Sequence, residues 1–191
     1  VINGISPFFK RLCLKPKYYH LRPKFLNVNR SESSKEQLPH TKKNYGLTLS
    51  IIKSVYLALD YFLLIFFDYF NRVRGRVLIF DRYYYDLIVD PSRFRYSGPK
   101  KLSEFFLKFI WKPNLIILFV ANPEIIHQRK PELSIDEIKR QLDSYEIFLN
   151  SKNIPYKIVR TDQSIDKSID EAKIHFIRSI SLLRKKNDNK R

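Results

Sequence analysis

The strongest constraint on the fold is a short apolar run that ends at two charged residues. Residues 77–80 read VLIF, and Asp81 and Arg82 follow at once. A run this short and continuously apolar predicts a strand buried on both faces, as strands of parallel sheets are. The acid and base that follow have two explanations. They are either a polar turn leading into solvent or a functional site at the carboxyl end of the strand.

Other short apolar runs alternate with helical patterns along the chain. Further strands are expected at residues 18–22, 115–121 and 155–160, and helices at 1–13, 47–74, 102–111, 138–150 and 165–183. This alternation predicts an α/β fold, in which helices cover a parallel sheet. The length of 191 residues suits a single domain, expected at 1–183. Within it, residues 27–45 are polar and form a variable loop, and residues 184–191 are a basic tail.

Punctuating residues mark where the helices begin and end. Gly75 is expected to end the long helix, as glycine commonly does. Asn122 before Pro123 predicts a helix start, and Ser134 with Glu137 three residues later forms a capping box. Residues 129–133 interrupt the helical pattern between these two helices.

Charge and cysteine content limit the class of protein. Lys and Arg total 36 against 19 acids, a formal charge of +17. Such an excess favours an anionic partner, namely a nucleotide, a nucleic acid or a membrane surface, although evenly spread charge also suits a solvated surface. The single cysteine, Cys13, excludes a framework of internal disulfides, so a reducing, cytoplasmic setting is expected.

The apolar stretch 47–70 raises the question of a membrane span. Lys53, Asp60 and Asp68 interrupt it, so it has no uninterrupted apolar window of the ~18 residues that a spanning helix needs. A charged side chain at the bilayer centre costs several kcal/mol. A buried core helix is therefore expected, and no transmembrane segment.

The residues after the strand at 77–80 suit the binding of a nucleotide. Arg82 can bind a phosphate through two hydrogen bonds, and Asp81 can bind hydrated Mg²⁺ or orient arginines. Tyr83, Tyr84 and Tyr85 offer flat faces for stacking a base. The alternatives are a structural ion pair for Asp81 and Arg82 and simple packing for the tyrosines.

Two more basic pairs follow along the chain. Arg93 and Arg95 lie in a loop punctuated by glycine and proline, and Arg129 and Lys130 lie in the break before a helix. A break of this kind is a natural place for a lid that closes over a ligand. Either pair could equally be solvated surface charge.

Together these pieces resemble the thymidylate kinase-like group of P-loop nucleoside monophosphate kinases. The resemblance rests on VLIFDRYYYD, DPSRFRYSGP, LIILFVANPEIIHQRKPE, the helix with Gln141 and Tyr145, and residues 20–23. It implies a three-layer α/β sandwich with a parallel sheet of the P-loop nucleoside-triphosphatase type. It also implies ATP-dependent phosphoryl transfer to thymidine monophosphate or a similar nucleotide, with ATP and Mg²⁺ as cofactors, and it leaves a homodimer open.

The resemblance also implies roles for individual residues. Arg82 and Arg22 would hold the acceptor phosphate, Asp81 would serve Mg²⁺ or the arginines, and Arg129 with Lys130 would close as the lid. Tyr61 stands where family members carry a substrate-binding arginine. The remaining substrate-contact candidates are Tyr84, Tyr85, Arg93 and Arg95.

The chain departs from the family in its phosphate loop. It has no G-x-x-x-x-G-K-[ST] motif, whose backbone amides cradle the donor phosphates, and it contains no methionine. The expectation is a fragment that begins just after the phosphate loop and is inactive as such. Two other functions stay open: a basic nucleic-acid-binding module, and a non-catalytic remnant or membrane-associated scaffold built on the long apolar helix.

Overall fold

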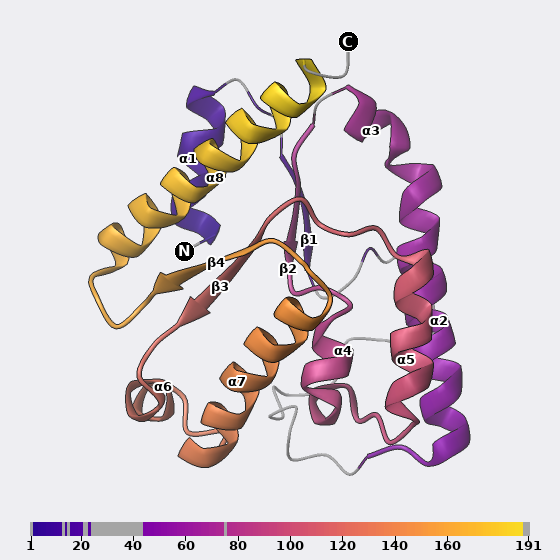
Figure 1. Ribbon diagram of the computed structural model, residues 1–191. Helices are drawn as coiled ribbons and strands as arrows, with labels where there is room; N and C mark the ends of the chain where they lie inside the picture. The colour runs from indigo at the N-terminus through magenta and orange to yellow at the C-terminus, as the bar shows by residue number, and fades with distance from the viewer. Residues whose placement is uncertain are drawn as a thin grey trace, which may run out of the picture. The chain divides into compact units, whose positions relative to one another are not determined.

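A computed structural model describes residues 2–12, 14, 16–20, 23, 44–74 and 76–188 (Figure 1). The chain divides into two compact units, which we call the middle unit (Leu14–Trp111) and the terminal unit (Val1–Cys13 with Lys112–Arg191). Both units combine helices with parallel strands, so the chain is α/β. The single domain expected at 1–183 stays a prediction.

The middle unit is built on two parallel strands. Strand β1 (Lys17–His20) pairs with β2 (Leu78–Asp81), with His20 opposite Asp81. The helical elements of this unit are α2 (Leu47–Phe67), α3 (Tyr69–Val73), α4 (Asp86–Val89), η2 (Pro91–Phe94), α5 (Lys100–Phe106) and η3 (Leu107–Phe109). Helix α5 packs against both α2 and α4.

The terminal unit has a matching parallel pair. Strand β3 (Ile116–Val120) pairs with β4 (Tyr156–Arg160). Its helices are α1 (Ile2–Arg11), α6 (Pro123–Arg129), α7 (Ile135–Ser151) and α8 (Ile165–Asp188). Figure 1 shows α1 beside α8, where the Phe9 ring meets Phe176 edge-on with centroids 4.8 Å apart.

The expected strands are present, but their burial differs from the expectation. All four lie within a few residues of their predicted positions, and both pairs are parallel. Among the described residues they form two two-stranded sheets instead of one. Each strand therefore has an unpaired edge there, and residues 78–80 are half-buried, not buried on both faces as predicted.

The predicted helix caps are largely confirmed. The Asn122 side chain accepts a hydrogen bond from the Glu124 amide (3.1 Å), and Ser134 accepts one from the Glu137 amide (3.2 Å). Helix α6 ends at Arg129, where the interruption was expected. Helix α8 continues to Asp188, so the predicted basic tail is helical over most of its length. Gly75 lies outside the described residues.

The long apolar helix is broken at Asp68, which corrects the single helix expected over 47–74. Asp68 is fully buried, and its carboxylate accepts hydrogen bonds from Lys17 (2.9 Å) and Asn71 (2.5 Å). A buried carboxylate needs such partners, because an unpaired charge in the interior is costly. The turn at Asp68 lets α3 bring Asn71 into this network and links the helix to β1.

Helix α2 has the length and composition of a membrane span. An 18-residue window of this helix has a mean hydropathy of 1.8, and 39% of that window is buried within the protein. Core helices of soluble proteins meet the same test, so the finding is weak evidence, and the predicted lack of a transmembrane segment stays a prediction.

Burial of two tyrosines predicts loss of stability at alkaline pH. Removal from water raises the pKa of both Tyr84 and Tyr85 from 10.0 to about 12. A phenol with a raised pKa stabilises the fold at pH values below its unfolded pKa. That contribution is lost as the pH rises from about 10 to about 12, and the free energy of unfolding falls by roughly 2–3 kcal/mol per tyrosine.

The expected result is cooperative unfolding in this pH window, followed by the absorbance of tyrosinate. Tyr84→Phe should remove part of the pH dependence, whereas Tyr18→Phe, at an exposed position, should not. Two buried phenols that ionise near pH 10 while the protein remains folded would contradict this account.

Candidate functional site

The carboxyl ends of β1 and β2 lie side by side and carry the first candidate residues. His20 and Asp81 are opposite each other in the parallel register, and His20 Nδ1 lies 2.8 Å from Asp81 Oδ2. Both side chains are exposed, at 66% and 50%. Parallel pairing therefore gathers polar groups at one edge of this sheet, as the sequence predicts for a ligand site.

Arg82 has a backbone conformation that residues other than glycine rarely adopt. Its φ is +81°, in the region that favours glycine, and strain of this kind costs of order 1–3 kcal/mol. Such strain persists where the surroundings fix it, and it is frequent at functional sites. It turns the chain sharply away from β2 directly after Asp81.

Asp86 holds the Arg82 side chain in place. Arg82 Nη1 lies 3.4 Å from Asp86 Oδ2, four residues further on, with the Arg82 side chain 34% exposed and that of Asp86 8%. A guanidinium has five N–H donors, so this long contact leaves capacity for a phosphate. The arrangement suits an arginine that Asp86 orients and that remains partly exposed to solvent.

The tyrosines near this strand end are buried. Tyr61, Tyr84 and Tyr85 are 1%, 2% and 4% exposed. The Tyr61 ring meets those of Tyr83 and Tyr84 edge-on, with centroids 5.0 and 5.8 Å apart, and the Tyr84 hydroxyl donates to the Ser103 carbonyl at 3.3 Å. In this structure the three residues belong to the core of the middle unit. Direct stacking on a base stays a prediction for them.

Arg93 and Arg95 belong to a second cluster, at η2. Arg93 Nε lies 3.4 Å from Asp90, which is buried and also accepts from the Arg93 amide. Arg95 has a φ of +53°, and its guanidinium stacks 4.0 Å from the Tyr45 ring. Lys53 Nζ lies 5.0 Å from the same ring and donates to the Phe94 carbonyl.

Sequence reasoning missed Tyr45, because it falls at the end of the expected loop 27–45. An aromatic residue just before the start of a helix was the available signal. Both arginines are held by neighbours in this cluster, and their contact with substrate stays a prediction. Arg22 lies outside the described residues.

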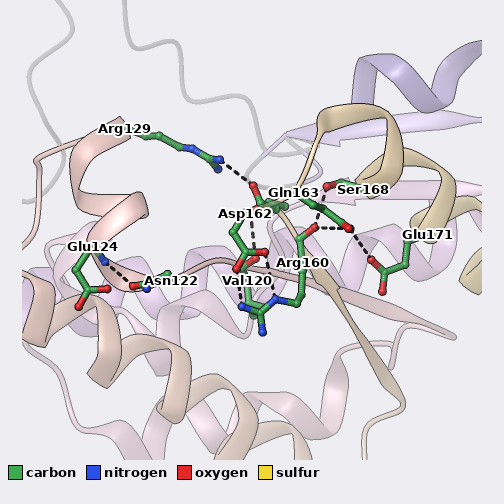
Figure 2. A network of polar contacts seen from close by, with 10 residues as sticks. Val120, Asn122, Glu124, Arg129, Arg160, Asp162, Gln163, Ser168 and Glu171 are labelled. Carbon is green, nitrogen blue, oxygen red and sulfur yellow. Dashed lines mark hydrogen bonds and ion pairs between the residues drawn. The ribbon is translucent and has the colours of Figure 1, made fainter.

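Arg129 and Lys130 lie in the terminal unit, at the end of α6. Arg129 Nη2 donates to the Thr161 carbonyl at 2.9 Å, as Figure 2 shows, and Lys130 Nζ lies 2.5 Å from Glu132 Oε1. Arg129 is therefore tied to the segment that follows β4 instead of extending into solvent. The contact is one exposed hydrogen bond, and the lid role of Arg129 and Lys130 stays a prediction.

A polar network at the ends of β3 and β4 was not foreseen from the sequence. The Thr161 amide donates to the Val120 carbonyl at 2.7 Å, and Arg160 pairs with Asp162 at 2.5 Å (Figure 2). The hydrogen bond between them lowers the pKa of Asp162 and raises that of Arg160. Beside it lies an open hollow of about 470 Å³ lined by Arg160, Gln163, Lys167, Asp170, Glu171 and Ile174.

Of the two implied cofactors, Mg²⁺ fits the residues of the site better than ATP does. No group of three or more His, Cys, Asp or Glu side chains that could hold a metal is present in the described part of the chain. Asp81 alone still suits Mg²⁺, which keeps its waters and is commonly bound by one or two carboxylates with substrate phosphates. ATP does not fit in the same way, because the sequence has no phosphate loop.

Comparison with protein-family models and with curated proteins gives no match. The candidate site therefore rests on its own geometry and on the resemblance of its motifs.

Proposed function

We propose that the carboxyl end of β2 binds the phosphate of a nucleoside monophosphate, such as thymidine monophosphate. The proposed reaction class is thymidylate kinase-like, ATP-dependent phosphoryl transfer, in which this site would bind the acceptor. The observation that carries this proposal is Arg82, held in a strained backbone at the end of a parallel strand and oriented by Asp86. The finer fold, a three-layer sandwich of the P-loop type, is part of the same proposal.

In this proposal each residue has a limited task. The Arg82 guanidinium donates to two phosphate oxygens, which neutralises charge and fixes the acceptor. Asp86 keeps the guanidinium in place, and Asp81 binds hydrated Mg²⁺ or, with His20, borders the phosphate. Phosphoryl transfer depends mainly on positioning and charge neutralisation, so the site needs no nucleophilic side chain.

The charge of +17 favours one alternative, a nucleic-acid-binding module. Against it, Tyr84 and Tyr85, which follow β2, are buried, whereas single-strand binders present open aromatic faces. The two functions differ in what they need from a ligand: a module for nucleic acid requires many phosphates, and the proposed site requires one.

Calorimetric titration of the full chain distinguishes these functions. Thymidine monophosphate is expected to bind saturably, and thymidine, which lacks the phosphate, at least about tenfold more weakly, because a charge-assisted contact is lost. Random-sequence duplex DNA serves as the comparison. Tight DNA binding that falls steeply with salt, together with no binding of the monophosphate, would favour the alternative and overturn the proposal.

A further inference from the structure

Helix α2 buries Leu57, Ala58, Tyr61 and Leu64 as a core helix does, but it also buries polar side chains and exposes large apolar ones. Its buried face includes small or polar side chains, and Ser50, Ser54 and Asp60 are all completely buried. Its exposed face is apolar. The members of that face are Leu49, Ile52, Val55, Leu59, Phe66 and Phe67, each between 37% and 63% exposed. Their spacing of three, four or seven residues places most of them on one stripe.

Helix α3, which follows α2 after Asp68, also exposes apolar side chains, and positive charge comes next along the chain. Tyr69, Phe70 and Val73 are 53%, 66% and 66% exposed, and Arg74 and Arg76 follow with exposed side chains. We call Phe66, Phe67, Tyr69, Phe70, Val73, Arg74 and Arg76 the aromatic–basic patch. Large exposed apolar patches on soluble proteins mark interaction sites.

We propose that the aromatic–basic patch docks α2 and α3 in the plane of an anionic membrane surface. The aromatic rings would enter the boundary between headgroups and acyl chains, and the two arginines would pair with lipid phosphates or carboxylates. This is the chemistry of interfacial helices, which combine aromatic and aliphatic residues with adjacent Lys and Arg. The inference does not depend on the proposed kinase function.

Charge selects a membrane over a second copy of the chain as the occupant. Two copies would each carry a formal charge of +17, so pairing through this patch works against electrostatic repulsion. An anionic lipid surface instead attracts both the whole protein and the exposed arginines. Docking in the plane also fits the packing of α2, because it leaves Ser50, Ser54 and Asp60 buried against the rest of the middle unit.

Co-sedimentation of the full chain with lipid vesicles tests the proposal. The chain is expected to bind vesicles of equimolar phosphatidylcholine and phosphatidylserine and to bind phosphatidylcholine vesicles much more weakly. The double variant Arg74→Gln, Arg76→Gln should lower the partition coefficient about 25-fold, since each basic residue near the surface contributes about fivefold. Phe66→Ser with Phe70→Ser should lower it at least about tenfold.

Matched controls come from the terminal unit. Ile147 is 68% exposed on α7 and Arg178 is exposed on α8, so Ile147→Ser and Arg178→Gln should leave vesicle binding unchanged. Equal binding by all variants would overturn the proposal. So would a concentration-dependent dimer, seen by analytical ultracentrifugation, that the Phe66→Ser, Phe70→Ser variant abolishes while no variant binds vesicles.

A structural role for the patch is tested by the thermal midpoint. The exposed phenylalanines should be replaceable with little change in stability, because surface substitutions usually have small effects. A large drop in the midpoint of the Phe66→Ser, Phe70→Ser variant would mean that another part of the same chain covers the patch, and it would overturn the membrane proposal.

Discussion

Replacing Arg82 with alanine is expected to weaken binding of thymidine monophosphate about ten- to a hundredfold, because a hydrogen bond to a charged group contributes roughly 1.5–3 kcal/mol. Arg82→Lys should restore only part of the affinity, since an ammonium group cannot contact two oxygens in the planar geometry of a guanidinium. Calorimetry on the full chain gives the affinities. Arg178→Ala, at an exposed arginine of α8, is the matched control and should bind normally.

The backbone of Arg82 provides a second comparison. Glycine adopts a φ of +81° without strain, whereas alanine does not. Arg82→Gly should therefore be more stable than Arg82→Ala by about 1 kcal/mol, while both lack the guanidinium and bind equally poorly. If instead Arg82→Ala lowers the thermal midpoint by many degrees and the folded fraction binds normally, Arg82 and Asp86 are a structural ion pair.

Tyr61→Ala is expected to destabilise the protein by about 3–5 kcal/mol, the usual cost of removing a large aromatic ring from a core. Tyr61 is 1% exposed and meets the rings of Phe80, Tyr83 and Tyr84. Its loss would open a cavity beside Phe80 of β2 and the tyrosines that follow it. Denaturant unfolding gives the free energy of unfolding for wild type and variant.

Leu59 is the matched control for this prediction, because it lies on the same helix but is 48% exposed. Leu59→Ala should change the free energy of unfolding by less than about 1 kcal/mol. An unchanged stability of Tyr61→Ala, combined with a loss of nucleotide binding, would instead favour the substrate-contact role that the family resemblance gives to this position.

Local patterns predicted the elements of this fold well. A continuously apolar run such as residues 116–120 and a side-chain cap such as Ser134 express preferences of a few neighbouring residues, and both appear where expected. The break at Asp68 could not be predicted in this way. It depends on a partner, Lys17, that is 51 residues distant in the sequence.

The candidate site was predicted less completely than the fold. The position of Asp81 and Arg82 at a strand end followed from the sequence, because parallel strands place their carboxyl ends at one edge. The positive φ of Arg82 did not follow, since nothing in the residue type indicates it. The pairing of Arg160 with Asp162 was also missed, because a charged residue at the end of a polar strand and another just after it are typical of ordinary surface.

The most direct test of the central claim is to observe Arg82 itself while nucleotide binds. In the full chain labelled with ¹⁵N-arginine, the Nε–H resonance of Arg82, assigned through Arg82→Lys, should shift saturably as thymidine monophosphate is added. That of Arg178 should stay in place. Phosphate binding at the end of β2 predicts this result. Saturable binding of the nucleotide with no change at Arg82 would contradict it and place the phosphate elsewhere on the chain.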